Sequence, residues 1–178
     1  MLKMFTTQLI GVFKKIEEKE EFSFEDGARL LAQAPVGDGT IYLFGTKEMK
    51  AVAAEAMEGA EALTGVRVLA AEAVEDLSDA DRVLIFSRTS RDVEAVEVAK
   101  RLQKKMIPFV AVSTVMDDTD SEGDLALLAD VHIDLRLRKG LLPDDAGNRF
   151  GYPSSMAALF VYHGLKFTID EILVEYEE

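Results

Sequence analysis

Hydrophobic and polar positions along the chain follow two periods, those of buried strands and of amphipathic helices. The clearest strand is residues 81–86, in which four consecutive apolar residues suit a parallel strand covered on both faces. Residues 94–102 switch to helical spacing. The hydroxyl-rich segment from Ser87 to Ser90 lies between them, and we expect it to be a turn that opens the helix. Unpaired N–H groups and the dipole at a helix N-terminus favour an anion, for which phosphate is the natural candidate.

The same patterns predict the remaining elements of the chain. Residues 67–70 are expected to form an edge strand, followed by an acidic connection, and residues 136–152 a loop. Ser23 is the expected N-cap of the second helix. Pro35 and the glycines after it should end that helix. Helices are predicted over 3–20, 23–33, 49–63, 94–102 and from 152 onwards, and strands over 40–45, 67–70, 81–86, 106–113 and 130–135.

Strands that alternate with helices predict an α/β protein, a three-layer sandwich around a mainly parallel, doubly wound, flavodoxin-like sheet. Right-handed crossovers place the turns after Gly45 and Phe86 at the same edge of the sheet, where ligands of such folds bind. The 178 residues fit one domain, 1–178. We expect residues 1–35 to form N-terminal helices that pack on this domain or on a partner subunit.

Composition narrows the class of protein. No apolar run is long enough to span a bilayer, the N-terminus lacks the features of a secretory signal, and the chain has no cysteine, so we expect a cytoplasmic protein. The formal charge of −13 repels nucleic acid and anionic lipid, and we expect neither as a partner. A phosphate site must therefore supply local cations. Lys47, Arg88 and Arg91 lie in suitable loops, although each could serve only surface solubility.

Residues 117–124 form an acidic loop that raises the idea of a divalent cation site. Its carboxylates do not follow the ligand order of a calcium-binding loop, which ends in a glutamate. A solvated loop is the better interpretation. We expect neither a metal nor another cofactor.

Several stretches together resemble the sugar isomerase (SIS) domain family, most closely a divergent bacterial branch near phosphoheptose isomerase. Ser87 and Thr89 fall on the two hydroxyl positions of the family's Ser-x-Ser-Gly phosphate loop, and Ser90 replaces the glycine. The stretches that carry the resemblance are 38–46, 81–98, 100–113, 125–131 and 159–174. The resemblance implies that a phosphorylated sugar binds through Gly45, Thr46, Lys47, Ser87, Arg88, Thr89 and Ser90.

The catalytic positions of that branch are only partly kept. Phosphoheptose isomerases carry a histidine and a glutamate one turn apart on the helix after the first loop. Here Glu58 takes the histidine place, Ala62 the glutamate place, and Glu61 is one position off. His163 falls on the family's catalytic histidine of the last helix. The resemblance therefore implies His163, Glu61 and Glu58 as candidates for aldose–ketose isomerisation through an enediol, and it implies no family-type metal site.

Three functions stay open at this point. The first is a sugar-phosphate isomerase, which needs one base near two adjacent carbons and a second acid or base for the oxygens. The second is a binding or sensor module that keeps the phosphate loop without catalysis, and the broken Glu/His pattern favours it. The third is a structural oligomer. The resemblance also implies assembly as a homodimer or homotetramer, for which the amphipathic helix over 3–20 is suited.

Overall fold

The computed structural model describes residues 1–116 and 123–177 and contains a five-stranded sheet in which all paired strands are parallel. Its strands follow the order β2-β1-β3-β4-β5, so the first strand lies inside the sheet, with β2 on one side of it and the later strands added in turn on the other. This confirms the expected α/β class and its flavodoxin-like order. The strands are β1 Ile41–Gly45, β2 Arg67–Val68, β3 Arg82–Thr89, β4 Phe109–Thr114 and β5 Val131–Asp134.

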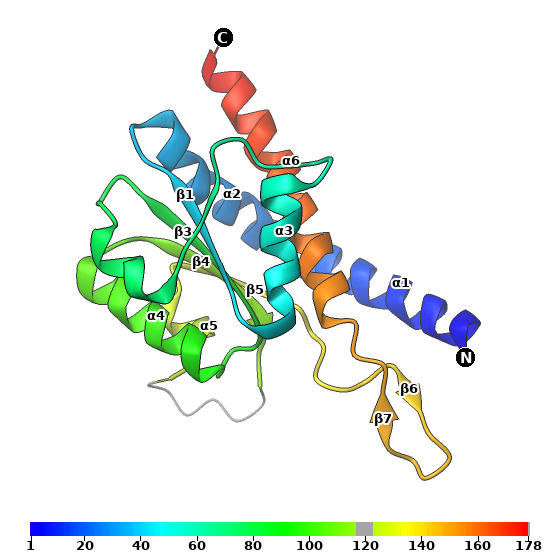
Figure 1. Cartoon of the computed structure of the whole chain (residues 1–178). Helices are drawn as coiled ribbons and strands as arrows, with labels where there is room; N and C mark the ends of the chain where they lie inside the picture. The colour runs from blue at the N-terminus through cyan, green and yellow to red at the C-terminus, as the bar shows by residue number, and fades with distance from the viewer. Residues whose placement is uncertain (117–122, 178) are drawn as a thin grey trace.

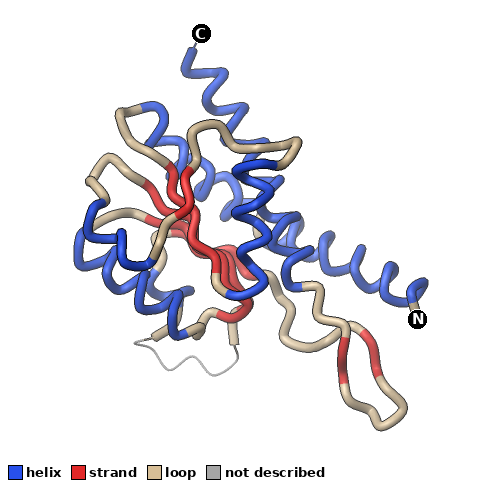
Figure 2. The backbone as a smooth tube through the Cα atoms, in the orientation of Figure 1, coloured by secondary structure: helices blue, strands red, loops and turns tan. Residues whose placement is uncertain are grey.

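Helices cover both faces of the sheet and produce three layers (Figures 1 and 2). Leu84 and Phe86 of β3 join the core under α2, α3 and α6, whereas Val83 and Ile85 join the core under α4 and α5. The run of apolar residues in β3 is thus explained by burial on two sides. The helices are α1 Leu2–Lys19, α2 Glu21–Val36, α3 Lys50–Glu58, α4 Val93–Lys105, α5 Leu125–Leu128 and α6 Ser154–Glu177, with 3₁₀ turns η1 Lys47–Met49 and η2 Ala71–Asp76.

Helix α1 extends away from the sheet, beside a short antiparallel hairpin (Figure 1). The hairpin pairs β6 Leu142–Pro143 with β7 Arg149–Phe150. Only Ile16 of α1 is fully buried, and Phe13 stacks on Phe160 of α6 with ring centroids 4.6 Å apart. The base of α1 is therefore fixed to the domain while most of its length is exposed.

Several predicted boundaries were wrong. Helix α2 begins at Glu21, so Ser23 lies inside the helix rather than capping it, and Pro35 is accommodated in its last turn. Helix α3 ends at Glu58, five residues early, because Gly59 leaves the helical conformation and its N–H bonds to Glu55 O. The hairpin lies within the region that was expected to be all loop. Among the described residues, no helix is long and apolar enough to cross a membrane.

Gly39 connects α2 to β1 and gives a direct test of this packing. A Cβ at Gly39 would overlap the carbonyl of Ala80, whereas a Cβ at Gly11 of α1 would meet nothing within 4 Å. We expect Gly39→Ala to destabilise the protein by at least about 2 kcal/mol, because backbone must move to make room. The matched control Gly11→Ala should stabilise it by roughly 0.5–1 kcal/mol through helix propensity. Urea unfolding measures both, and equal effects would contradict the packing described.

Candidate functional site

The loops that follow β1 and β3 meet at the carboxyl edge of the sheet. Thr46 N donates to Phe86 O at 3.1 Å, which ties the end of β1 to β3. The turn after Gly45 is very tight, since a Cβ there would lie 2.8 Å from Met49 O. Lys47 adopts a left-handed backbone conformation with φ of 50°. Such strain in a non-glycine residue is sparsely populated and concentrates at ligand-binding turns.

Two hydroxyl groups at this edge are buried without a partner. Thr46 is 1% exposed and Ser90 is fully buried, yet neither Oγ1 of Thr46 nor Oγ of Ser90 has a hydrogen bond to any residue that the structure describes. A buried hydroxyl without a partner costs about 1–3 kcal/mol. The neighbouring Ser87 instead donates its hydroxyl to Thr89 O at 2.7 Å. Thr46 and Ser90 therefore hold donors that the folded chain leaves unused.

The helix N-terminus expected to receive an anion is filled by the chain itself. Strand β3 continues through a register shift to Thr89, so the predicted hydroxyl-rich turn is mostly strand. Helix α4 starts only at Val93, and Asp92 caps it by accepting a hydrogen bond from Ala95 N at 3.1 Å. A carboxylate already satisfies one of the free N–H groups and the helix dipole.

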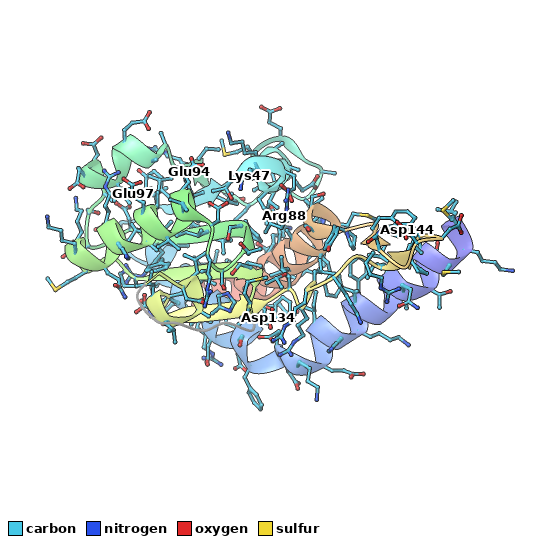
Figure 3. All side chains as sticks on the ribbon, turned by 90° about the horizontal axis from the view of Figure 1, so that it is seen from below. Lys47, Arg88, Glu94, Glu97, Asp134 and Asp144 are labelled. Atoms are coloured by element: carbon cyan, nitrogen blue, oxygen red, sulfur yellow. The ribbon has the colours of Figure 1, made fainter. Side chains whose placement is uncertain are left out.

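Two of the three candidate cations at this edge are paired with acidic residues. Lys47 Nζ lies 3.0 Å from Asp92 Oδ2, and Arg88 Nε lies 2.6 Å from Glu48 Oε1. The hydrogen bond from Arg88 lowers the pKa of the Glu48 carboxyl, so this carboxyl is ionised at neutral pH. Figure 3 shows Lys47 and Arg88 on neighbouring elements at this edge. Together the four side chains carry no net charge.

Arg91, the third candidate cation, is directed elsewhere. Its Nε lies 3.7 Å from Oδ2 of Asp124, a fully buried residue that caps α5 by accepting from Ala126 N. Arg91 therefore stands apart from the Lys47–Asp92 and Arg88–Glu48 pairs.

The three candidate catalytic residues do not join the hydroxyl groups of the carboxyl edge. Helix α3 starts near that edge and runs back along the sheet for nine residues, about 13 Å. Glu58 at its end and Glu61 beyond it are therefore carried away from Thr46. Lys166 of α6 binds Glu61 at 2.8 Å, and His163 lies one turn before Lys166. His163 and Glu61 thus belong to a second cluster, between α6 and the end of α3.

Glu61 of this second cluster is not adapted as a strong base. The hydrogen bond from Lys166 lowers the pKa of Glu61, with a smaller contribution from the charge of His163. His163 is half-buried among Tyr162 and Phe167, and its Nδ1 is buried without a hydrogen-bond partner. A proton-abstracting carboxylate needs a raised pKa. The geometry fits ion pairing better than proton transfer.

A histidine that the sequence patterns did not single out, His132, makes a hydrogen bond within the sheet. His132 lies on β5, and its Nε2 is 2.7 Å from Oγ of Ser113 on β4. Burial lowers the pKa of His132 to about 4, against the opposing charges of Asp134 and Asp124. His132 is therefore neutral at neutral pH. The 19-residue separation from Ser113 left no local signal of this pair.

No group of three or more metal-ligating side chains occurs in residues 1–116 and 123–177. The acidic loop considered for a cation lies mainly outside the described residues, since only Gly123 and Asp124 of it are placed.

Comparison with solved structures defines the class of fold, that of sugar isomerase (SIS) domains. The E. coli CFT073 protein c3406, solved in complex with a phosphosugar, superposes with a TM-score of 0.71 at 15% identity and covers 97% of this chain and 89% of its own. Phosphoheptose isomerase GmhA from Neisseria gonorrhoeae gives 0.68 at 16% identity, with 96% of each chain covered. Vibrio vulnificus NanR, complexed with ManNAc-6P, gives 0.72 at 16% identity and covers 99% of this chain, which spans 64% of NanR.

The chain belongs to the family described as Domain of unknown function (DUF2529), which it matches over residues 1–173. It is 45% identical over 176 residues to the Uncharacterized protein YwjG of Bacillus subtilis (strain 168), covering 99% of both chains. The predicted SIS fold is confirmed. The phosphoheptose branch stays a prediction.

His132 makes stability depend on pH in a defined window. Its pKa is about 4 in the folded protein against an ordinary value of 6.5, so the unfolded chain takes up the proton first as the pH falls. The stability that neutral His132 contributes is fully present above pH 6.5 and is lost as the pH falls towards 4. We expect the free energy of unfolding to fall by about 2 kcal/mol from this group near pH 5.

The variant His132→Gln is the matched comparison, because glutamine can still bond to Ser113 but does not titrate. Urea unfolding at about pH 7.5 and about pH 5 should show a larger loss in the wild type than in the variant. Equal losses would mean that His132 is not held neutral by burial.

Proposed function

We propose that this cytoplasmic protein binds a phosphorylated sugar at the carboxyl edge of β1 and β3, as a binding or sensor module. The observation that carries the proposal is the pair of buried, unpartnered hydroxyls of Thr46 and Ser90. A phosphate oxygen accepts hydrogen bonds from such groups and would remove the cost of leaving them unpaired. Gly45 and the strained Lys47 keep the turn between them close to the strand ends.

The position of this edge supports the same proposal. Ligands of open parallel sheets bind outside the carboxyl ends of the strands, which is where these hydroxyls lie. Two of the structures with the same fold are complexes with phosphosugars, one of which is ManNAc-6P. Lys47 and Arg88 supply cations once they leave Asp92 and Glu48.

Binding without turnover by a single chain is favoured over isomerisation. The reaction requires a base next to the two carbons that exchange the proton. The candidate bases lie away from the carboxyl edge. Glu58 ends α3, Glu61 follows it, and His163 lies on α6 one turn before Lys166, which binds Glu61. An isomerase would have to complete the site with residues of a second copy. Assembly as a homodimer or homotetramer is part of the proposal, because α1 exposes Leu2, Met4 and Ile10.

Removal of the two hydroxyls tests the proposal, because it should weaken ligand binding without lowering the stability of the free protein. We expect Ser90→Ala and Thr46→Val each to weaken binding of ManNAc-6P or arabinose 5-phosphate about tenfold, because each loses a hydrogen bond to a charged group. Neither variant should lower the unfolding free energy, since the hydroxyls have no partner in the free protein. Calorimetric titration and urea unfolding measure the two quantities.

Thr6→Val, at an exposed position on α1, is the control and should bind as the wild type does. Unchanged binding in both site variants would overturn the proposed site. Conversion of the bound sugar phosphate into its aldose or ketose isomer would favour the isomerase instead.

The Lys47–Asp92 ion pair predicts that one substitution tightens binding. Asp92→Asn keeps a good helix cap but releases Lys47 for the phosphate. We expect the affinity for a sugar phosphate to rise about threefold to tenfold, an energy of roughly 1 kcal/mol. Asp79→Asn is the control, because it removes an equal charge from the amino end of β3. Equal gains in both variants would assign the effect to net charge alone.

A further inference from the structure

A groove of about 510 Å³ runs between α1 and the chain that leaves β5 towards the hairpin. Lys15 of α1 lines one side, Arg136, Arg138 and Lys139 of the chain after β5 line the other, and Arg149 of β7 also lines the groove. The groove therefore gathers five cationic side chains. No aspartate or glutamate is among its lining residues.

This composition is unusual for a chain with 33 acidic and 20 basic residues. The groove on the other side of α1, between α1, α2 and α6, is lined by six glutamates, among them Glu17, Glu18 and Glu21. Lys14 faces that acidic groove, whereas the adjacent Lys15 faces the basic one. Charge is thus separated across the helix rather than mixed over the surface, which concentrates positive potential in one groove.

Three of the five cationic side chains have no acidic partner among the described residues. Arg136 pairs with the buried Glu20 at 2.5 Å. Lys15, Lys139 and Arg149 make no ion pair or side-chain hydrogen bond with any residue in the described part of the chain. The carboxylate of Asp144 on the hairpin, labelled in Figure 3, accepts instead from Ala146 N and from both nitrogens of Asn148.

The wall of the groove is held in a fixed, strained shape. Arg136 adopts a left-handed conformation with φ of 58°, fastened by Asp134 Oδ1, which accepts from its N–H at 2.8 Å, and by Glu20. Gly140 packs so closely on Phe150 that a Cβ would overlap the phenylalanine backbone. Strain of this kind persists only where surrounding contacts enforce it, and it is common at ligand sites.

From these observations we infer that the groove is a second anion site, which takes a small molecule with two or more phosphate groups. Its volume is within the range of small-ligand sites, and several separated cations suit several phosphates better than one. The charge of −13 repels long polyanions and anionic membranes, so the groove favours a compact ligand that contacts only this region. The inference is independent of the hydroxyls at β1 and β3, because β5 lies two strands away from β3.

The test titrates the full chain with inorganic pyrophosphate and with ADP, by calorimetry at low ionic strength. We expect the double variant Lys139→Gln/Arg149→Gln to weaken binding of both probes by at least about tenfold. Lys14→Gln, which removes one positive charge from the side of α1 that faces the acidic groove, should change the affinity less than about twofold. Circular dichroism should show that both variants fold as the wild type does.

Four results would overturn the inference. They are the absence of pyrophosphate and ADP binding by the wild type, equal losses in the double variant and in Lys14→Gln, loss of pyrophosphate binding in Ser90→Ala, and binding to anionic phosphatidylserine vesicles without binding to either small probe. The third result would place the anion at the carboxyl edge of β1 and β3. Retained pyrophosphate binding in Ser90→Ala, with sugar-phosphate binding weakened, separates the two sites.

Discussion

Burial of β3 on both faces is the constraint on which the arrangement of the whole protein depends. Val83 and Ile85 are enclosed by the α4 layer, and Leu84 and Phe86 by the α2 and α6 layer. A strand without a solvent face needs helices on both sides, and helical crossovers make its neighbours parallel. All carboxyl ends then share one edge. This is how Thr46, bonded to Phe86 O of β3, and Ser90, bonded to Thr114 O of β4, come to lie at the same edge of the sheet.

The carboxyl edge is polar but electrically balanced, and this balance shapes what it can bind. The Arg88–Glu48 pair is exposed on both sides, at 53% and 31%, so water screens it, whereas Lys47, which is 64% exposed, pairs with an Asp92 side chain that is only 5% exposed. An exposed pair such as Arg88–Glu48 contributes at most about 1 kcal/mol. A ligand phosphate can therefore replace Glu48 as the partner of Arg88 at little cost in free energy. Selectivity then depends on the buried hydroxyls, which no surface carboxylate satisfies.

The local pattern of apolar and polar residues was sufficient to predict the layers of the fold, because buried strands and helices have characteristic hydrophobic periods. The apolar residues of 83–86 and the helical spacing of 94–102 needed no tertiary information. The segment between them did, because its end is set by Ser90 N bonding to Thr114 O across the sheet. The same limit hid His132, whose partner Ser113 lies on another strand. Long-range hydrogen bonds leave no local trace.

The candidate catalytic glutamates are separated from the carboxyl edge by the length of α3. Glu58 and Glu61 were assigned from the catalytic positions of the helix after the first loop, yet α3 carries them about 13 Å along the sheet. Only the direction of α3, fixed by the crossover from β1 to β2, reveals this. A family resemblance aligns positions along the chain, and it transfers a mechanism only where those positions also meet in space.

The two proposed anion sites use different physics, and this explains how one acidic chain can hold both. At the strand ends, neutral hydroxyls and backbone geometry do the binding while cations and carboxylates cancel. In the proposed groove site beside α1, Lys15, Lys139 and Arg149 would attract the anion, and six glutamates line the groove on the other side of the helix. Attraction between exposed charges weakens as salt shortens the Debye length, whereas a buried hydrogen bond is little affected. The groove should therefore lose affinity with ionic strength far more steeply than the strand ends.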